Sequence, residues 1–147
     1  MQVSQILKLK GSEIVALSGA DSLLQAVALM STRDIGSLLV MDGNEMRGLV
    51  TFREIISALH RYSGDIGNVL VEQVMVKDPL TCDPDDSIDA LRRNMLSTHS
   101  RYVPVLRGGA LLGVISFHDV AKAVLDRQDF ENRMLKGYIK NWPEAQG

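Results

Sequence analysis

The chain contains one structural pattern twice. Residues 48–55 read GLVTFREI, and residues 113–120, which begin 113 − 48 = 65 positions later, read GVISFHDV. In each copy a short apolar strand ends at a hydroxyl residue and turns at once into a helix with an acidic residue in its first turn. Backbone N–H groups then converge on one spot, which can hold an anion. The two copies predict that the chain is a tandem repeat of one structural unit.

The duplication extends well beyond these two junctions. Without a gap, the same register matches helix caps, helix faces and turn glycines in the two halves. A chance alignment rarely keeps all of these features in phase. The identical pairs include Asp21 with Asp86, Ser22 with Ser87, Met30 with Met95, Val40 with Val105, Gly43 with Gly108, and Phe52 with Phe117.

Each half is predicted to run strand, helix, strand, strand, helix. In the first half, hydrophobic periodicity and turn residues place these elements at 14–17, 22–33, 37–41, 46–50 and 52–62, with a hairpin turn at 42–44 and a linker at 63–68. A three-stranded sheet with both helices on one face leaves an apolar face uncovered, and packing two halves together covers it. The predicted fold class is therefore α+β, with two βαββα repeats.

Helices are also predicted before and after the repeats. An amphipathic N-terminal helix at 3–9 ends before Gly11. The tail from Asp126 to Trp142 is predicted to be a helix whose apolar stripe needs a partner, either the N-terminal helix of the same chain or a second chain. The stripe consists of Phe130, Met134, Leu135, Tyr138, Ile139 and Trp142. The predicted divisions are 1–65 for the first repeat with the N-terminal helix, 66–128 for the second repeat, and 129–147 for the tail.

Composition limits the classes of partner. The net charge of −2 comes from interspersed acidic and basic residues, which argues against nucleic acid because a phosphate backbone needs a concentrated basic face. No apolar run approaches the roughly 20 residues that span a bilayer, so no membrane partner is expected. Cys82 is the single cysteine and residues 1–10 show no secretory signal, so we expect no disulfide, no cysteine metal cluster and a cytoplasmic location.

These features resemble the cystathionine-β-synthase (CBS) domain, and the tandem arrangement resembles the Bateman module. The resemblance covers about residues 3–125 and includes the paired junctions, VMVKDPLT at 74–81 and RYVPV at 101–105. The tail resembles that of small stand-alone bacterial proteins made of a CBS pair alone. The resemblance implies two halves related by a pseudo-twofold axis, a homodimer of pairs, and adenosine-containing ligands in clefts between the halves.

For the second half, the resemblance implies a complete site. Asp119 would bind the ribose hydroxyls, and Ser116, with the helix N-terminus after it, would face phosphate. Arg101 would supply a cationic phosphate contact, and His118 is interpreted as a cleft residue. Adenine in such modules is held by backbone groups and apolar side chains, and the matching positions are Leu80, Thr81, Cys82, Val103 and Pro104.

For the first half, the match is weaker. Thr51 fits the pattern, but Glu54 replaces the usual Asp and adds a methylene group, while Gly36 occupies the place of Arg101. Arg53 stands where related stand-alone pairs commonly have arginine, and we expect it to meet phosphate. The two clefts are therefore predicted to be unequal.

Two other interpretations remain open. Both hydroxyl and acid pairs, Ser116 with Asp119 and Thr51 with Glu54, also have the spacing of a capping box, which stabilises a helix by about 0.5–2 kcal/mol without a ligand. A structural or dimerisation module is therefore the alternative. A nucleotide-hydrolysing enzyme is less favoured, because the sequence has no triad signature, metal-ligand motif or P-loop. We predict no catalytic residue, no metal and no catalytic cofactor.

The leading interpretation is a regulatory module that senses adenine nucleotides. A ligand that bridges both halves favours the arrangement in which both supply contacts, and this shift would pass to an unidentified protein partner. AMP, ADP, ATP and NAD(H) all present a ribose diol and phosphate. The sequence therefore does not distinguish among these ligands.

Overall fold

The order of helices and strands follows the duplication. The computed structural model describes residues 1–11 and 13–140, the last three of them by backbone alone. Each repeat contains a helix, an antiparallel strand pair and a second helix, as predicted. The elements are α1 Val3–Lys10, β1 Ala16–Leu17, α2 Leu23–Arg33, β2 Ser37–Asp42, β3 Glu45–Thr51, α3 Phe52–Arg61, α4 Val71–Val74, α5 Ile88–Thr98, β4 Tyr102–Arg107, β5 Ala110–Ser116 and α6 Phe117–Lys140.

The two hairpins share the same irregularity. β2 pairs with β3 and β4 with β5, both antiparallel, and the pairing register shifts after Val40 in one hairpin and after Val105 in the other. Gly43 and Gly108 form the turns with φ of 61° and 58°, a conformation that glycine adopts without strain. The sequence duplication therefore holds at the level of individual strand pairs.

The first strand of each repeat is shorter than predicted. The strand expected at 14–17 is reduced to β1, which pairs in parallel with β2, and its counterpart is a single parallel bridge between Cys82 and Val105. Tight turns explain the shortening: Asp21 Oδ2 accepts a hydrogen bond from Ser18 N at 2.9 Å. Asp86 Oδ2 accepts the equivalent bond from Asp83 N at 2.9 Å. The chain turns away directly after Leu17 and after Cys82.

The helix starts are capped as the sequence indicates. Ser22 Oγ accepts a hydrogen bond from Gln25 N at 3.1 Å, and Gln25 Oε1 accepts one from Ser22 N at 2.7 Å. Ser87 Oγ caps α5 through Ala90 N at 3.0 Å. At the opposite ends of α2 and α5, Asp34 and His99 both take the left-handed conformation. That conformation turns the chain from each helix into the following strand.

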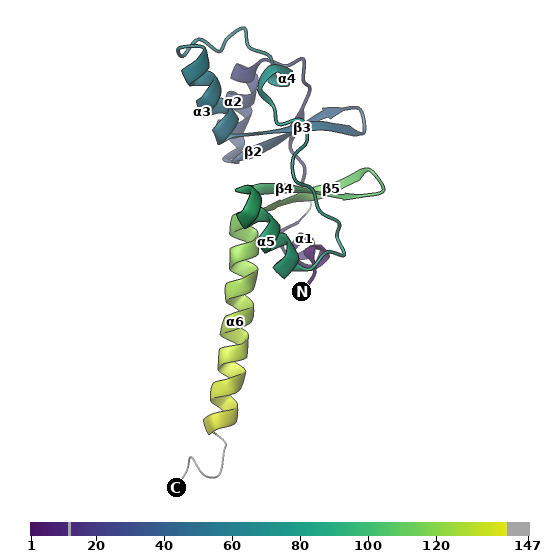
Figure 1. Ribbon diagram of the computed structural model, residues 1–147, viewed down its shortest axis with the longest axis vertical. Coiled ribbons are helices and arrows are strands. Elements are labelled where there is room, and N and C mark those ends of the chain that lie inside the picture. The colour runs from purple at the N-terminus through teal and green to yellow at the C-terminus, as the bar shows by residue number, and fades with distance from the viewer. Residues whose placement is uncertain (12, 141–147) are drawn as a thin grey trace.

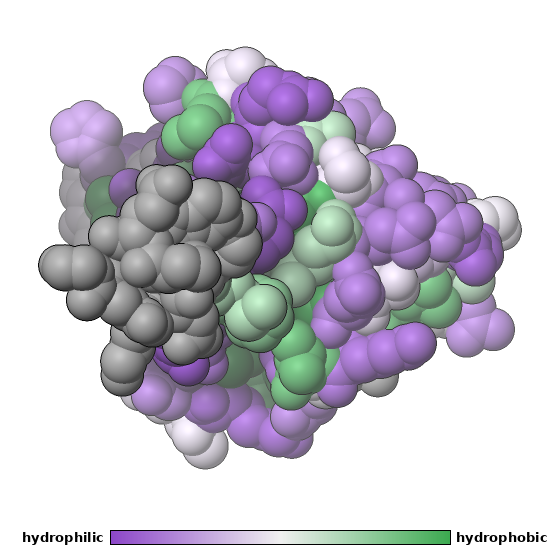
Figure 2. Space-filling view, turned by 90° about the horizontal axis from the view of Figure 1, so that it is seen from below, coloured by the Kyte–Doolittle hydropathy of each residue, from purple (hydrophilic) through white to green (hydrophobic). Residues whose placement is uncertain are grey.

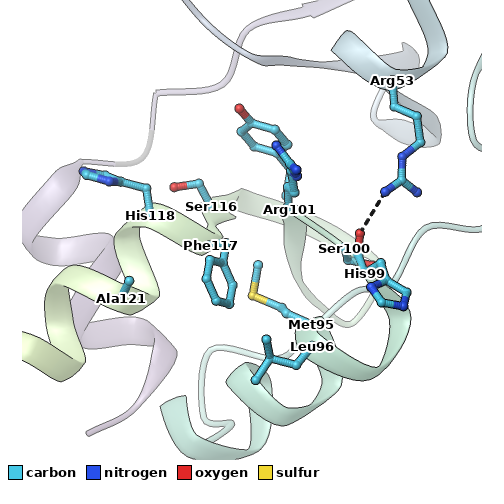
Figure 3. Close-up of a pocket in the computed structure, with 11 residues that line it drawn as sticks. Arg53, Met95, Leu96, His99, Ser100, Arg101, Ser116, Phe117, His118 and Ala121 are labelled. Atoms are coloured by element: carbon cyan, nitrogen blue, oxygen red, sulfur yellow. Dashed lines mark hydrogen bonds between the residues drawn. The ribbon is translucent and has the colours of Figure 1, made fainter. Parts of the chain in front are cut away.

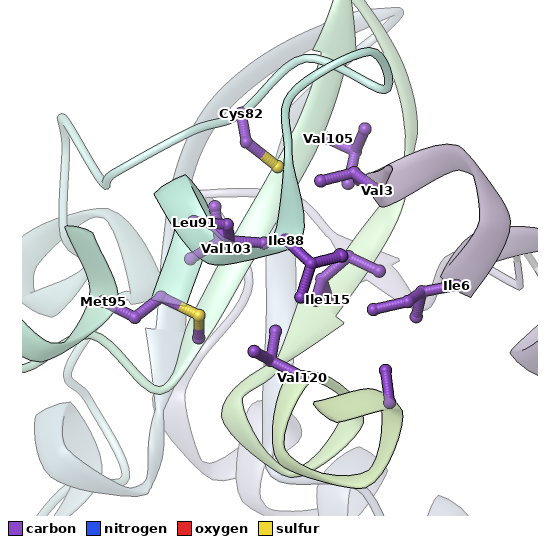
Figure 4. Packing of buried hydrophobic residues seen from close by; sticks show 11 residues of the cluster. Val3, Ile6, Cys82, Ile88, Leu91, Met95, Val103, Val105, Ile115 and Val120 are labelled. Atoms are coloured by element: carbon purple, nitrogen blue, oxygen red, sulfur yellow. The ribbon is translucent and has the colours of Figure 1, made fainter. Parts of the chain in front are cut away.

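The hydrophobic cores exchange segments between the repeats. Val3 and Ile6 of α1 pack in the cluster of the second repeat with Ile88, Leu91, Val103 and Ile115 (Figure 4). Conversely, Ile66, Val69 and Val71 pack in the cluster of the first repeat. Backbone hydrogen bonds reinforce the exchange, from Val3 N to Asp86 O at 3.0 Å and from Leu23 N to Val69 O at 2.7 Å. The packing units therefore differ from a division of the sequence at 65/66.

The two strand pairs face each other at the centre of the molecule. Figure 1 shows β2 and β3 above β4 and β5, with α2 and α3 beyond the first pair and α5 beyond the second.

α6 continues as a single helix of 24 residues from the second repeat, so the tail helix predicted to begin at Asp126 is its continuation and the boundary at 128/129 falls inside it. Trp142 and the side chains of Tyr138 and Ile139 lie outside the described residues. No described helix combines the length and apolar character that crossing a membrane requires.

Candidate functional site

A capping box holds the strand-to-helix junction of the second repeat. β5 ends at Ser116 and α6 begins one residue later. Asp119 Oδ2 accepts a hydrogen bond from Ser116 N at 2.9 Å, and Ser116 Oγ accepts one from Asp119 N at 3.0 Å. The two hydrogen bonds expected from the spacing are therefore present, and they fix both side chains at the N-terminus of α6.

Lys10, at the end of α1, reaches this junction. Its Nζ donates to Asp119 Oδ2 at 2.6 Å and to the carbonyl oxygen of Val114 at 2.9 Å. The Asp119 side chain is 18% exposed. Burial alone raises the pKa of Asp119, but hydrogen bonds from Lys10 and Ser116 and the charge of Lys10 outweigh burial, so the pKa lies below its ordinary value. Asp119 is a partly buried carboxylate whose partner is supplied by the N-terminal helix.

At the strand-to-helix junction of the first repeat, Thr51 and Glu54 hydrogen-bond to each other. Glu54 Oε1 accepts hydrogen bonds from Thr51 N and Thr51 Oγ1, both at 2.8 Å. Thr51 Oγ1 also accepts a hydrogen bond from Arg53 N at 3.2 Å. The longer glutamate side chain therefore reaches the same capping position that Asp119 takes in the other repeat.

A cavity of about 820 Å³ lies beside the second junction and draws residues from both repeats. Arg53 enters from α3, and its Nη2 donates to the carbonyl oxygen of His99 at 3.3 Å. Figure 3 shows Arg53 facing the residues of the second repeat across this cavity. The polar lining consists of Arg53, His99, Ser100, Arg101, Tyr102, Ser116 and His118, and the apolar lining of Met95, Leu96, Phe117 and Ala121. Two permanent cations and an apolar floor suit an anionic ligand with a nonpolar part.

A second cavity, of about 200 Å³, lies on the other side of Ser116 and Tyr102. Four aliphatic side chains from both repeats line it beside the charged side chains of Lys10 and Glu13. The lining consists of Lys10, Glu13, Val15, Ile35, Gly36, Ser37, Leu39, Tyr102, Val114 and Ser116. Ser116 and Tyr102 line both cavities, so the two spaces adjoin at these residues.

The Tyr102 side chain packs directly against Gly36 across the two repeats. A Cβ at position 36 would overlap the Tyr102 hydroxyl and come within 3.2 Å of the Phe52 ring. Glycine at position 36 therefore lets the Tyr102 ring cross from the second repeat to the first. The sequence comparison had paired Gly36 with Arg101 by register, whereas the structure shows that Gly36 makes room for the neighbour of Arg101.

The cavities do not follow the two predicted sets of site residues, one for each half of the chain. Arg53 and Gly36, assigned to the first-half cleft, line cavities with Ser116 of the second-half set, and Arg53 does so with Arg101 and His118. Thr51 and Glu54 pair with each other and line neither cavity. The five residues predicted to hold adenine also line neither cavity: Val103 and Cys82 are buried in the core, Leu80 packs against that core, and Pro104 accepts a backbone hydrogen bond from Cys82. Thr81, the last of the five, is exposed.

Several lining residues escaped the sequence analysis. Lys10 lies 109 residues from Asp119, and no pattern in the sequence links them. Tyr102 appeared only as part of the RYVPV stretch, although it lines both cavities. The sequence analysis assigns no role to His99, whose place at the left-handed end of α5 puts it on the cavity wall. Asp34, 65 residues earlier in the chain, ends α2 in the same left-handed conformation. This correspondence between the repeats is the sequence signal that could have identified position 99.

Within the part of the chain that the structure describes, neither a reactive thiol nor a metal-binding cluster is found. Burial, followed by the charges of Asp86 and Asp83, raises the pKa of the Cys82 thiol to about 12. A thiol of that pKa is a poor nucleophile near neutral pH. Among the described residues, no group of three or more His, Cys, Asp or Glu side chains is arranged to hold a metal ion.

Comparisons with known proteins agree on one family. The family model described as "CBS domain" matches residues 4–61 and 71–126. The A-adding tRNA nucleotidyltransferase of Geobacter sulfurreducens is 32% identical over 114 residues, which is 78% of this chain but only 13% of that protein. The structure of a putative signal-transduction protein with CBS domains from Burkholderia ambifaria superposes with a TM-score of 0.81 and 33% identity, covering 87% of this chain and 96% of that one.

A further structure is similar in fold. It is the CBS domain pair of protein MJ0100, solved in complex with 5-methylthioadenosine and S-adenosyl-L-methionine, and it superposes with a TM-score of 0.76. Its sequence identity is 19%, and the match covers 86% of this chain and 98% of that one. At this identity the similarity shows a shared fold alone.

Proposed function

The chain belongs to the CBS-domain family, with two copies of the domain, and from that premise we propose that it is a regulatory module that binds an adenosine-containing ligand between its repeats. The observation that carries the proposal is the pair of adjoining cavities that share Ser116 and Tyr102. The smaller space offers four aliphatic side chains, those of Val15, Ile35, Leu39 and Val114, and the larger one holds the guanidinium groups of Arg53 and Arg101. A nucleotide likewise carries its base at one end and its phosphate at the other.

In the proposed complex the nucleoside occupies the smaller cavity. Val15, Ile35 and Leu39 offer an apolar wall for a purine. Asp119 lines neither cavity itself, but its partners Lys10 and Ser116 line this space. In the proposed complex it accepts the hydrogen bonds of a ribose diol once Lys10 shifts to another partner. The solved complex of MJ0100 with two adenosine-containing compounds supports this class of ligand, because that protein shares the fold.

The phosphate end occupies the larger cavity. Arg53 from the first repeat and Arg101 from the second line this space together with the first turn of α6. Guanidinium groups can grip phosphate oxygens with paired hydrogen bonds, and a helix N-terminus favours negative charge. AMP, ADP, ATP and NAD(H) all satisfy these requirements, so the proposal extends to the class of adenine nucleotides and not to one member.

The proposed mechanism is a population shift. A phosphate held by Arg53 and Arg101 ties the two repeats together, and a ligand shifts an equilibrium only by its differential affinity for the two arrangements. A regulated partner protein would then read the arrangement. We place this activity in the cytoplasm and assign no reaction to the module itself.

One observation favours a second candidate, a structural module without a ligand. Asp119 pairs with Lys10 and Ser116, and Glu54 pairs with Thr51, so both junction carboxylates are satisfied within the protein. On this hypothesis the capping boxes serve stability and the cavities hold water. Ligand binding separates the two candidates.

The test measures the thermal unfolding midpoint with AMP, ADP, ATP, NADH and, as a control for base recognition, ribose 5-phosphate. A ligand at about 100 times its dissociation constant adds roughly 2.7 kcal/mol to stability, which raises the midpoint of a chain of this size by about 5–10 °C. The response is expected to fall in Arg53→Gln and to persist in Arg61→Gln, an exposed arginine at the far end of the same helix.

The result that would overturn the proposal is the absence of a shift with every nucleotide at millimolar concentration. Mass spectrometry of small molecules that copurify with the protein gives an independent readout. Release of inorganic phosphate from ATP would instead support the hydrolase hypothesis.

A further inference from the structure

The larger cavity is lined by basic side chains and by no carboxylate. Its eleven lining residues include Arg53, His99, Arg101 and His118, all four of them exposed, and neither Asp nor Glu. Within residues 1–11 and 13–137, neither arginine forms an ion pair with a carboxylate. Arg53 donates instead to the carbonyl oxygen of His99 at 3.3 Å. The cavity therefore presents positive charge that no described side chain neutralises.

The fold of the repeat does not require these basic residues. In the 65-residue register, the positions equivalent to His99 and Arg101 are Asp34 and Gly36. Asp34 and His99 both end a helix in the left-handed conformation, so an acidic and a basic side chain serve the same backbone turn. The positive charges at positions 99 and 101 are therefore a property of this cavity and not of the repeat.

The surface of α6 differs from the cavity in its balance of charge. Figure 2, which views the molecule from the α6 end, shows hydrophilic and hydrophobic side chains mixed on this face. Residues 126–136 of the helix carry three carboxylates, two arginines and one lysine, and Arg127 lies 3.5 Å from Asp89. Acidic and basic groups offset each other along this helix, whereas the lining of the cavity has basic groups alone.

The basic side chains are spread along the larger cavity. Figure 3 shows His118 at one end and Arg53 at the other, with Arg101 between them. A single phosphate group bonds only to donors within hydrogen-bond distance of its own oxygens, so it cannot reach both ends. A chain of two or three phosphates places oxygens at successive points along the row. The volume of about 820 Å³ leaves room for such a chain.

We propose that the larger cavity binds a chain of two or three phosphates, so that the ligand is a nucleoside di- or triphosphate in preference to a monophosphate or S-adenosyl-L-methionine. The inference rests on the proposed function, which places the phosphate end of the ligand in this cavity. Arg53 and Arg101 each pair with a different phosphate, because a guanidinium group can donate two hydrogen bonds to one phosphate. S-adenosyl-L-methionine carries a sulfonium cation in place of phosphate, and the basic lining disfavours it.

The first test measures dissociation constants by isothermal titration calorimetry for adenosine, AMP, ADP, ATP and S-adenosyl-L-methionine, at one pH and one ionic strength. Affinity is expected to rise about fivefold with each added phosphate, the factor that corresponds to 1 kcal/mol for an exposed charge pair. S-adenosyl-L-methionine is expected to bind more weakly than AMP. Added salt is expected to narrow these differences, because it screens exposed charges.

The second test repeats the series with charge variants. Arg101→Gln and Arg53→Gln are each expected to lower the ratio of ATP to AMP affinity about fivefold and to leave adenosine affinity unchanged, because adenosine has no phosphate. Arg93→Gln is the matched control, since Arg93 is an exposed arginine on α5 that lines neither cavity. Circular dichroism verifies that all three variants retain the fold.

Inorganic tripolyphosphate separates this inference from the proposed function, because it carries the phosphate chain without the nucleoside. It is expected to compete with ATP and to bind Arg101→Gln more weakly than wild type. Equal affinity for AMP and ATP, or S-adenosyl-L-methionine binding as tightly as ATP, would overturn the inference and leave the proposed function standing. Tripolyphosphate binding as tightly as ATP would support the inference and remove adenosine recognition. No binding of any of these compounds would overturn both.

Discussion

Lys10 Nζ lies 2.6 Å from Asp119 Oδ2 and joins the end of α1 to the start of α6 across 109 residues of sequence. In this contact Lys10 already occupies the carboxylate that the proposed function assigns to a ribose diol. Lys10 also lines the smaller cavity. Under the proposed function, ligand binding in this space is therefore coupled to the position of the N-terminal helix.

Replacement of Lys10 by Met is expected to strengthen adenosine binding. The change frees Asp119 without introducing a charge, so the ribose gains about one net hydrogen bond, worth roughly 0.5–1.5 kcal/mol and a gain in affinity of about twofold to twelvefold. Asp119→Asn is expected to weaken binding by a similar factor. Isothermal titration calorimetry with adenosine measures both effects.

Lys8→Met is the matched control for that experiment. Lys8 is an exposed lysine on the same helix and lines neither cavity, so its removal changes net charge equally and leaves adenosine affinity unchanged. Equal affinity in wild type and in Lys10→Met would mean that ribose and Lys10 do not compete for Asp119.

The same ion pair predicts an acid-dependent loss of stability. The pKa of Asp119 in the folded state lies below its ordinary value, which is about 3.9 for an unfolded chain. Its contribution to the free energy of unfolding is therefore fully present above pH 4. The contribution is lost as the pH falls from about 4 through the folded-state pKa, because the unfolded state then binds a proton that the folded state lacks.

Urea unfolding of wild type and Asp119→Asn from pH 7 to pH 2.5 measures this effect. The difference in stability between the two proteins is expected to shrink in the acid range. Asp65→Asn, at an exposed position, serves as the reference substitution. A difference between wild type and Asp119→Asn that stays constant over the whole range would contradict the pairing with Lys10.

The repeat explains why most of the fold could be predicted. Caps and turns depend on residues three or four apart, so Ser22 with Gln25, and the turn glycines Gly43 and Gly108, indicate their structures directly. The first strands were predicted too long, because the side chains of Asp21 and Asp86 draw the chain into a turn. The packing of α1 in the core of the second repeat could not be predicted from nearby residues, since Val3 and Ile6 would suit either core.

The site was less predictable than the fold, for a physical reason. Ser116 and Asp119 belong to one local cap, and their hydrogen bonds follow from spacing alone. The cavity walls depend on which surfaces meet when two repeats pack, as with Tyr102 against Gly36. The predicted sets followed each repeat separately, whereas the cavities combine residues of both.

Gly48 is predicted to be intolerant of a side chain. A Cβ at position 48 would lie 2.6 Å from the carbonyl oxygen of Val76 and 2.8 Å from Met75 Sδ. The adjacent bridge, with Leu49 N to Val76 O at 3.0 Å and Val76 N to Leu49 O at 2.8 Å, ties the start of the second repeat to β3. Because backbone cannot move aside as a flexible side chain can, Gly48→Ala is expected to cost about 1–3 kcal/mol in the free energy of unfolding.

Gly67→Ala is the matched substitution, because a Cβ there has no heavy atom within 4 Å. Its effect is expected to stay within about 0.5 kcal/mol in the same urea titration. Similar costs for the two variants would indicate that the bridge between β3 and Val76 yields easily.

Cys82 is predicted to be almost inert to thiol reagents in the folded protein. The residue is 8% exposed, and burial together with Asp86 and Asp83 raises its pKa to about 12. At pH 8 about one thiol in ten thousand is then ionised, and the thiolate is the reactive form. Native protein is expected to react with Ellman's reagent far more slowly than protein unfolded in guanidinium, where the thiol pKa returns to about 8.5. The raised pKa also means that stability declines as the pH rises above 8.5, because the unfolded state then loses a proton that the folded state keeps. Rapid labelling of the native chain at pH 8 would show that the thiol is open to solvent and that the packing beside Val105 is loose.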